Sequence, residues 1–151
     1  METREIAGFL FVGDPHLSGN IPGRRKDKDY TTRILGKLAQ AVDIANERDL
    51  LVVFLGDLFE RPVQDDEWMR ARLHEELRRG RHRPVTNVGN HVPAGRRLRE
   101  GDSLYTVWST GLLDVAATSG GFETFSVGGL KVGLGFTPHG QEIPRDVRHV
   151  L

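Results

Sequence analysis

Three short apolar runs in the sequence each end in a glycine that is followed by an aspartate or an asparagine. These runs lead into Gly13-Asp14-Pro15-His16, Gly56-Asp57-Leu58-Phe59 and Gly89-Asn90-His91. Carboxylates that are packed together repel one another, so a cluster of this kind attracts cations. Oxygen and imidazole ligands without sulfur favour manganese, iron or zinc over magnesium or calcium. An aspartate that bridges two such ions, about 3.5–4 Å apart, helps to clamp a phosphoryl group while water attacks it.

The segments between these motifs have the lengths and patterns of strands and helices. Residues 6–12 and 50–55 are nearly continuous apolar runs, which suit strands buried on both faces of a parallel sheet. Residues 30–47 carry apolar side chains at helical spacing, and Asp29 precedes them as a candidate N-cap. A strand, a helix and a second strand form a βαβ unit with a right-handed crossover.

The same alternation continues along the chain. A second helix is predicted over residues 65–79, with acidic residues at its start and basic residues at its end, and a third strand over 84–88. Asp102 or Ser103 is expected to cap a short helix that continues to Thr110. Short strands are then predicted over 113–118, 122–127 and 130–136, with Gly128–Gly129 as a hairpin turn. The pattern predicts an α/β fold whose strands are parallel first and antiparallel later.

The polar residues that follow the first three strands are expected to converge. In a parallel sheet the carboxyl ends of neighbouring strands lie side by side, and ligands bind there. Asp14, His16, Asp57, Asn90 and His91 would then share one small volume. A glycine before each ligand lets the backbone turn without a side chain in the way. Asp14 and His16 are two residues apart and, in an extended segment, would point to the same side. One Gly-Asp pair alone is a common turn, whereas three such strand ends in order indicate a site.

The three motifs resemble those of the calcineurin-like metallophosphoesterases, whose sequences contain D-x-H, G-D and G-N-H in this order. The resemblance covers residues 6–92. It implies an α/β sandwich of mixed β-sheets flanked by helices. It also implies an enzyme, a metal-dependent hydrolase of phosphodiester or phosphomonoester bonds, in which two divalent metal ions activate water.

The resemblance also assigns a role to each residue of the motifs. Asp14 and His16 would bind the first metal ion, Asp57 would bridge the two, and Asn90 would bind the second. His91 would be the catalytic residue, donating a hydrogen bond or a proton to the phosphate or its leaving group. Manganese is the first choice of metal, with iron or zinc as alternatives.

Within the family, the details look most like the exonuclease subunit of double-strand-break repair complexes and related phage and bacterial phosphoesterases. The likeness rests on Gly56-Asp57-Leu58-Phe59 and on Thr137-Pro138-His139-Gly140 with Ile143-Pro144. It adds nuclease activity and DNA as a candidate substrate to the expectation of a phosphate ester.

Two departures from the family pattern bear on activity. Val92 stands where the family has an acidic residue that orients the preceding histidine. The later histidine and the G-H-x-H motif, which supply further ligands in the family, do not occur before Leu151. His139 could face the same sheet edge, whereas His74 and His82 are expected at the surface. The fold is therefore expected to be incomplete at its carboxyl end. The alternatives are an inactive remnant, a binding module of the same fold, or a partner subunit that supplies the missing histidines.

Composition limits the number of domains, the partners and the cellular location that can be expected. A chain of 151 residues with 38% hydrophobic residues suits one domain, 1–151, with one core. Lys plus Arg and Asp plus Glu each total 21, so no global field attracts nucleic acid or a membrane. The absence of cysteine excludes disulfides and thiolate metal sites. With no signal-peptide pattern and no membrane-spanning run, a cytoplasmic protein is expected.

Two loops carry local positive charge beside the predicted site. The residues are Arg24, Arg25, Lys26 and Lys28 after the first motif, and Arg96, Arg97 and Arg99 after the third. These cations either guide phosphates toward the metals or are ordinary solvated charges, and the sequence leaves both interpretations open.

Overall fold

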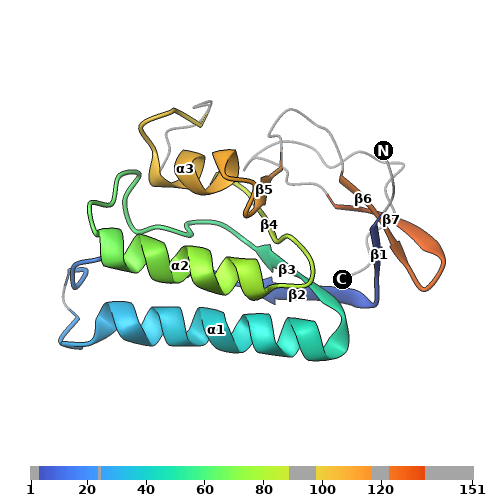
Figure 1. Cartoon of the computed structure of the whole chain (residues 1–151), viewed down its shortest axis with the longest axis horizontal. Helices are drawn as coiled ribbons and strands as arrows, with labels where there is room; N and C mark the ends of the chain where they lie inside the picture. Colours follow the sequence, from blue (N-terminus) through green and yellow to red (C-terminus); the bar gives the residue numbers. More distant parts are fainter. Residues whose placement is uncertain (1–3, 24, 89–97, 117–122, 135–151) are drawn as a thin grey trace.

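A computed structural model describes residues 4–23, 25–88, 98–116 and 123–134, and within them the chain forms two sheets and three helices (Figure 1). One sheet has the strand order β2-β3-β4-β5 and the other β1-β6-β7. The elements are β1 (Arg4–Ile6), β2 (Gly8–Val12), α1 (Tyr30–Arg48), β3 (Leu50–Phe54), α2 (Glu67–Arg79), β4 (Val85–Thr86), α3 (Ser103–Ser109), β5 (Asp114–Val115), β6 (Glu123–Val127) and β7 (Leu130–Leu134). The predicted α/β class, with two sheets and flanking helices, is confirmed.

The strand predicted over residues 6–12 is wrong as a single element. The chain forms β1 and β2 there, and the two strands belong to different sheets. Ala7 separates them, and its N–H donates to the carbonyl of Asp49 at 2.9 Å instead of continuing a ladder. An apolar run is expected wherever both faces are buried, so the pattern could not show that the chain changes sheets partway along it.

The four-stranded sheet is parallel throughout, as expected for its first strands. β2 pairs with β3 from Gly8 opposite Leu50 to Val12 opposite Phe54. β4 pairs with the end of β3, and β5 pairs with β4. Two further hydrogen bonds connect the segments that follow these strands at their carboxyl ends. Leu55 N–H donates to the Val12 carbonyl, and the Asn87 side-chain amide donates to the Leu55 carbonyl, both at 3.0 Å. The strands that precede the three motifs are therefore neighbours, as predicted.

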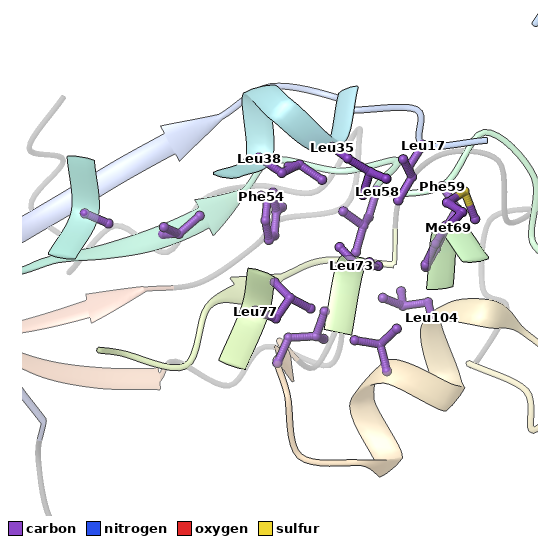
Figure 2. Close-up of a cluster of buried hydrophobic side chains, with 14 residues drawn as sticks. Leu17, Leu35, Leu38, Phe54, Leu58, Phe59, Met69, Leu73, Leu77 and Leu104 are labelled. Atoms are coloured by element: carbon purple, nitrogen blue, oxygen red, sulfur yellow. The ribbon is translucent and has the colours of Figure 1, made fainter. Parts of the chain in front are cut away.

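Alternate residues of β3 build two cores, one on each face of the sheet. Val52 and Phe54 pack with α1, α2 and α3 in the larger cluster, part of which is shown in Figure 2. Leu51 and Val53 lie on the other face, in a cluster with residues of β1, β4 and β6. Because successive side chains of a strand point to opposite faces, a five-residue strand buried at nearly every position needs cover on both sides.

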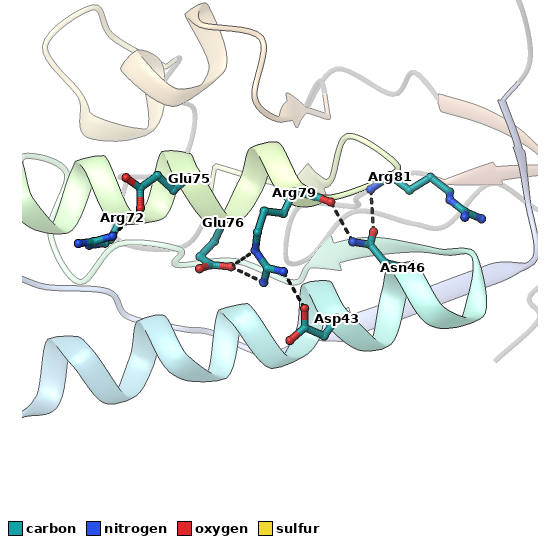
Figure 3. A network of polar contacts seen from close by, with 7 residues as sticks. All are labelled: Asp43, Asn46, Arg72, Glu75, Glu76, Arg79 and Arg81. Atoms are coloured by element: carbon teal, nitrogen blue, oxygen red, sulfur yellow. Dashed lines mark hydrogen bonds and ion pairs between the residues drawn. The ribbon is translucent and has the colours of Figure 1, made fainter.

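α1 and α2 lie side by side, and their carboxyl-terminal ends are tied by polar contacts (Figure 3). The Arg79 guanidinium donates to Asp43 at 2.8 Å and to Glu76 at 2.6 Å. The Asn46 side chain donates to the Arg79 carbonyl and accepts from Arg81 N–H. Exposed pairs of this kind contribute less than about 1 kcal/mol each, so they fix the relative position of the helices more than they stabilise the fold.

The later elements also follow the sequence closely. Asp102 occupies the N-cap position of α3, but its carboxylate accepts from Arg99 N–H at 3.0 Å and makes no capping hydrogen bond to the helix. β6 and β7 form an antiparallel hairpin, and Gly128 and Gly129 have φ values of 55° and 79°, the left-handed conformation that a two-residue hairpin turn needs. None of the helices in the described part of the chain is long and apolar enough to cross a membrane.

Candidate metal centre

The loops that follow β2 and β3 are joined by backbone hydrogen bonds. His16 N–H donates to the Asp57 carbonyl at 2.9 Å, and Leu17 N–H donates to the Leu58 carbonyl at 2.8 Å. Glu60 N–H returns to the Leu17 carbonyl at 3.0 Å. This short parallel ladder continues the sheet beyond its strands. It fixes the loop that carries Asp14 and His16 against the loop that carries Asp57.

Both loops contain backbone conformations that L-residues rarely adopt. His16 has a φ of 49° and Asp57 a φ of 38°. Gly56 has a φ of 152°, in a region that is open almost only to glycine. His and Asp tolerate the left-handed region better than most residues, but this conformation still costs them conformational free energy. Strain of this kind is concentrated at functional sites. Two predicted ligands thus lie where the chain turns sharply out of the sheet.

The structure corrects two parts of the sequence reasoning at the first motif. Gly13 has no positive φ, and a Cβ built there would meet nothing within 4 Å, so glycine is not sterically required at that position. The left-handed conformation of His16 also means that Asp14 and His16 do not lie on one extended segment. Their placement depends instead on the ladder with the loop after β3.

The His16 imidazole is held by an acidic residue that the sequence reasoning missed. Its Nδ1 lies 2.8 Å from Oε2 of Glu60, and both side chains are about one-third exposed. The Tyr30 hydroxyl donates to the His16 carbonyl at 2.7 Å, and burial raises the pKa of Tyr30, which keeps its proton available. A metal-binding histidine commonly gives one ring nitrogen to a carboxylate and the other to the metal. The available signal was Glu60 itself, three residues after Asp57 in the same loop.

The other predicted ligands differ in how they are placed. Asp14 is exposed, and Asp57 is half-buried beside a small cavity that Leu58, Arg61 and Val88 also line. Asn90 and His91 lie outside the described residues. In the part of the chain that the structure describes, no three His, Asp or Glu side chains come close enough together to hold a metal ion.

The donor chemistry of the two joined loops nevertheless suits divalent metal. Asp14 and Asp57 supply carboxylates and His16 supplies an imidazole, without sulfur, which is the donor set that manganese, iron and zinc accept. Glu60 supplies the orienting contact that such a histidine uses.

The expectation that His74 and His82 lie at the surface is wrong. His74 is partly buried on α2, and this burial, helped by Arg78 and Arg70, lowers its pKa. The His82 ring is only 15% exposed and lies 2.9 Å from Oδ1 of Asp49. His74 lies in the middle of α2 and His82 just beyond its end, and residue type alone does not reveal that neighbouring parts of the chain cover either ring. His139 lies outside the described residues.

The loop cations are only partly described. Arg25 lies with its guanidinium 5.2 Å from the centre of the Tyr30 ring, and Lys26, Lys28 and Arg99 are exposed. Arg24, Arg96 and Arg97 lie outside the described residues. Tyr30 connects Arg25 to the first motif, because its ring lies against the Arg25 guanidinium and its hydroxyl donates to the His16 carbonyl.

Comparison with known proteins identifies a family. The family model described as Calcineurin-like phosphoesterase matches residues 8–150, which is nearly the whole chain. No curated protein matches the sequence.

Proposed function

The chain belongs to the calcineurin-like phosphoesterase family, and on this basis we propose that it hydrolyses phosphate esters with the help of two divalent metal ions. Metal-dependent phosphoester hydrolysis is the general activity of the family. The observation that supports the proposal most is the ladder between the loops after β2 and β3, since it joins the Asp14–His16 segment to Asp57. The likeness to an exonuclease subunit, in contrast, stays a prediction.

In this proposal the ligands come from three strand ends. Asp14 and His16 would hold the first ion, Asn90 would hold the second, and the Asp57 carboxylate would bind both. When bound, the ions act as Lewis acids toward the phosphate and make the attacking water more acidic. His91 donates a proton or a hydrogen bond to the leaving oxygen. Manganese is the proposed metal, with iron and zinc as alternatives.

Mn²⁺-stimulated hydrolysis of bis(p-nitrophenyl) phosphate tests the proposal, together with the metal content of the purified chain by elemental analysis. We expect two ions per chain and release of p-nitrophenolate above a metal-only blank. Two bound ions without turnover would overturn the proposed activity for this chain. Weak or single-metal binding would instead favour an inactive remnant or a binding module, or a partner subunit that completes the site.

Glu60 has the position of a residue that orients His16. Replacing it with alanine removes the carboxylate 2.8 Å from Nδ1, and loss of such a partner lowers metal affinity about 10- to 100-fold. Glu60→Gln keeps an acceptor of the same length and is expected to fall between wild type and Glu60→Ala. Manganese affinity is measured by titration, with the free ion followed by its electron paramagnetic resonance signal.

Glu75→Ala is the matched control for Glu60→Ala, because Glu75 is an exposed α2 residue paired with Arg72. Its manganese affinity should equal that of wild type. A Glu60→Ala variant that binds manganese as tightly as this control would show that Glu60 does not position the histidine.

DNA cleavage is a narrower form of the same proposal. It is supported by the likeness of Gly56-Asp57-Leu58-Phe59 to nuclease sequences and by the exposed cations Lys26 and Lys28 in the loop that follows the first motif. The same assay with an end-labelled oligonucleotide tests it. A single domain over residues 1–151 and a cytoplasmic location likewise remain proposals that rest on sequence.

A further inference from the structure

A cleft opens beside the proposed metal centre. Its volume is about 610 Å³, and it lies between residues 18–23, which precede α1, and residues 60–67, which precede α2. Glu60 lines the cleft and also contacts His16, so a single side chain separates the cleft from a proposed metal ligand. A volume of this order accommodates one small organic group.

The two walls of the cleft are held close together. Gly19 N–H donates to Oε1 of Gln64 at 3.3 Å, across the two loops. A Cβ on Gly19 would lie only 2.5 Å from Cβ of Asp66, so the loops meet at this point with no room for a side chain. Gln64 N–H in turn donates to the Ser103 hydroxyl at 2.8 Å. The cleft is therefore preformed by contacts between elements.

The Gln64 side chain offers a hydrogen-bond donor in this wall. Gln64 is 5% exposed, and its Nε2 has no hydrogen-bond partner among the described residues. The bond from Gly19 fixes Oε1 as the acceptor, which leaves Nε2 to donate. A buried donor of this kind is costly unless something accepts from it, and because this atom is covered, a ligand carbonyl or hydroxyl would reach it only if the wall of the cleft shifts.

The charge of the cleft argues against a second phosphate. Among the described residues, its lining holds four carboxylates, those of Glu60, Asp65, Asp66 and Glu67, and a single guanidinium, that of Arg61. The amino end of α2 would attract an anion, but Asp66 already caps it by accepting from Met69 N–H at 2.8 Å. Glu67 also pairs with Arg70 at 3.0 Å, which leaves three lining carboxylates against Arg61, so an additional phosphate would still meet a net negative surface.

Resting on the proposed function, we infer that this cleft holds the organic group of a phosphodiester, and that this group is an uncharged alcohol such as a nucleoside. The exposed side chains of Ile21 and Val63 offer apolar surface to a ring, and the buried Gln64 side chain lies in the same lining. The inference narrows the substrate class toward small diesters. It therefore competes with the DNA-cleavage form of the proposed function, because a second phosphate follows each nucleoside in a polynucleotide.

Two chromogenic substrates that differ by one phosphate test this inference. They are the p-nitrophenyl ester of thymidine 5′-phosphate and the same ester with a phosphate on the 3′-hydroxyl. With manganese present, we expect wild-type kcat/KM to be about tenfold higher for the ester without the 3′-phosphate, which corresponds to roughly 1.4 kcal/mol of repulsion. Equal values, or a preference for the 3′-phosphorylated ester, would overturn the inference, and the second result would favour a nucleic-acid strand.

A charge reversal in the cleft should change this preference. Asp65 is exposed on the lining, and Asp65→Lys is expected to reduce the tenfold ratio to about threefold or less. Glu47→Lys makes the same change of net charge on an exposed position near the far end of α1 and should leave the ratio unchanged. A ratio that falls equally in both variants would show that net charge, not the cleft, sets the preference.

A binding measurement separates this inference from the proposed function. In nuclear magnetic resonance spectra of the full chain without added metal, thymidine should shift the Gly19 and Gln64 amide signals, and thymidine 3′-phosphate should shift them less. Failure to hydrolyse bis(p-nitrophenyl) phosphate would count against the proposed function alone. Absence of these shifts at millimolar thymidine would overturn the cleft inference whether or not the chain is active.

Discussion

The Asp57→Asn variant should lose at least about a thousandfold in metal-dependent hydrolysis of bis(p-nitrophenyl) phosphate. The removed carboxylate is the one proposed to lie between both metal ions, and a loss of about 4 kcal/mol of transition-state stabilisation corresponds to this factor. Asparagine is preferred to alanine because Asp57 has a φ of 38°, and asparagine tolerates the left-handed region without a new backbone cost. The initial rate of p-nitrophenolate release, at saturating manganese, measures the effect.

Asp49→Asn provides the matched control for Asp57→Asn. Asp49 also has a left-handed backbone, with a φ of 57°, but it precedes β3, whereas Asp57 follows that strand. The Asp49 carboxylate pairs with Arg81 and His82, whose hydrogen bonds lower its pKa, and it takes no part in the proposed site. Its activity should match that of wild type. An Asp57→Asn variant that retains more than a tenth of wild-type activity, with its fold intact, would contradict the proposed role.

The Phe54→Ala variant should lower the free energy of unfolding by about 3–5 kcal/mol. Phe54 is 2% exposed in the middle of the larger core, where Figure 2 shows it beside Leu38 of α1 and Leu77 of α2. Removing the ring leaves a cavity that the rigid sheet and two tied helices cannot collapse to fill. Because domains have only about 5–15 kcal/mol of stability, the loss is a large fraction of the total. Urea denaturation, followed by circular dichroism, measures it.

Phe11→Ala tests whether burial, and not the loss of any aromatic ring, explains that effect. Phe11 lies on the neighbouring strand, opposite Val53, but is 55% exposed. Within the described residues it stacks on Phe9, with 6.1 Å between ring centres. We expect its replacement to cost less than about 1 kcal/mol. Similar losses in the two variants would show that Phe54 does not occupy the core as described.

The motifs that carry the family likeness were recognisable because they are local. A strand that ends in Gly56-Asp57 is visible as an apolar run followed by a turn, and the helix over residues 30–47 is visible from its spacing. Both depend on residues that are close in sequence. The order of the strands followed from the helical crossover between them, and the structure confirms that β2, β3 and β4 are parallel neighbours.

Features that depend on distant residues were missed or wrongly predicted. The break at Ala7 depends on Asp49 and on pairing between β1 and β6, across more than a hundred residues. The contact between Glu60 and His16 depends on the ladder that joins two loops. The partly buried His82 ring contacts Asp49, which lies 33 positions earlier in the sequence.

The sequence by itself determined the α/β class, the parallel strands and the family, because periodicity, turn residues and motif order are properties of short segments. The tertiary structure alone decided where the chain changes sheets, which carboxylate contacts His16 and that a cleft with acidic walls lies beside the proposed metal site. The physical reason is that a side chain's partners are chosen by packing, and packing brings together residues that no local pattern relates.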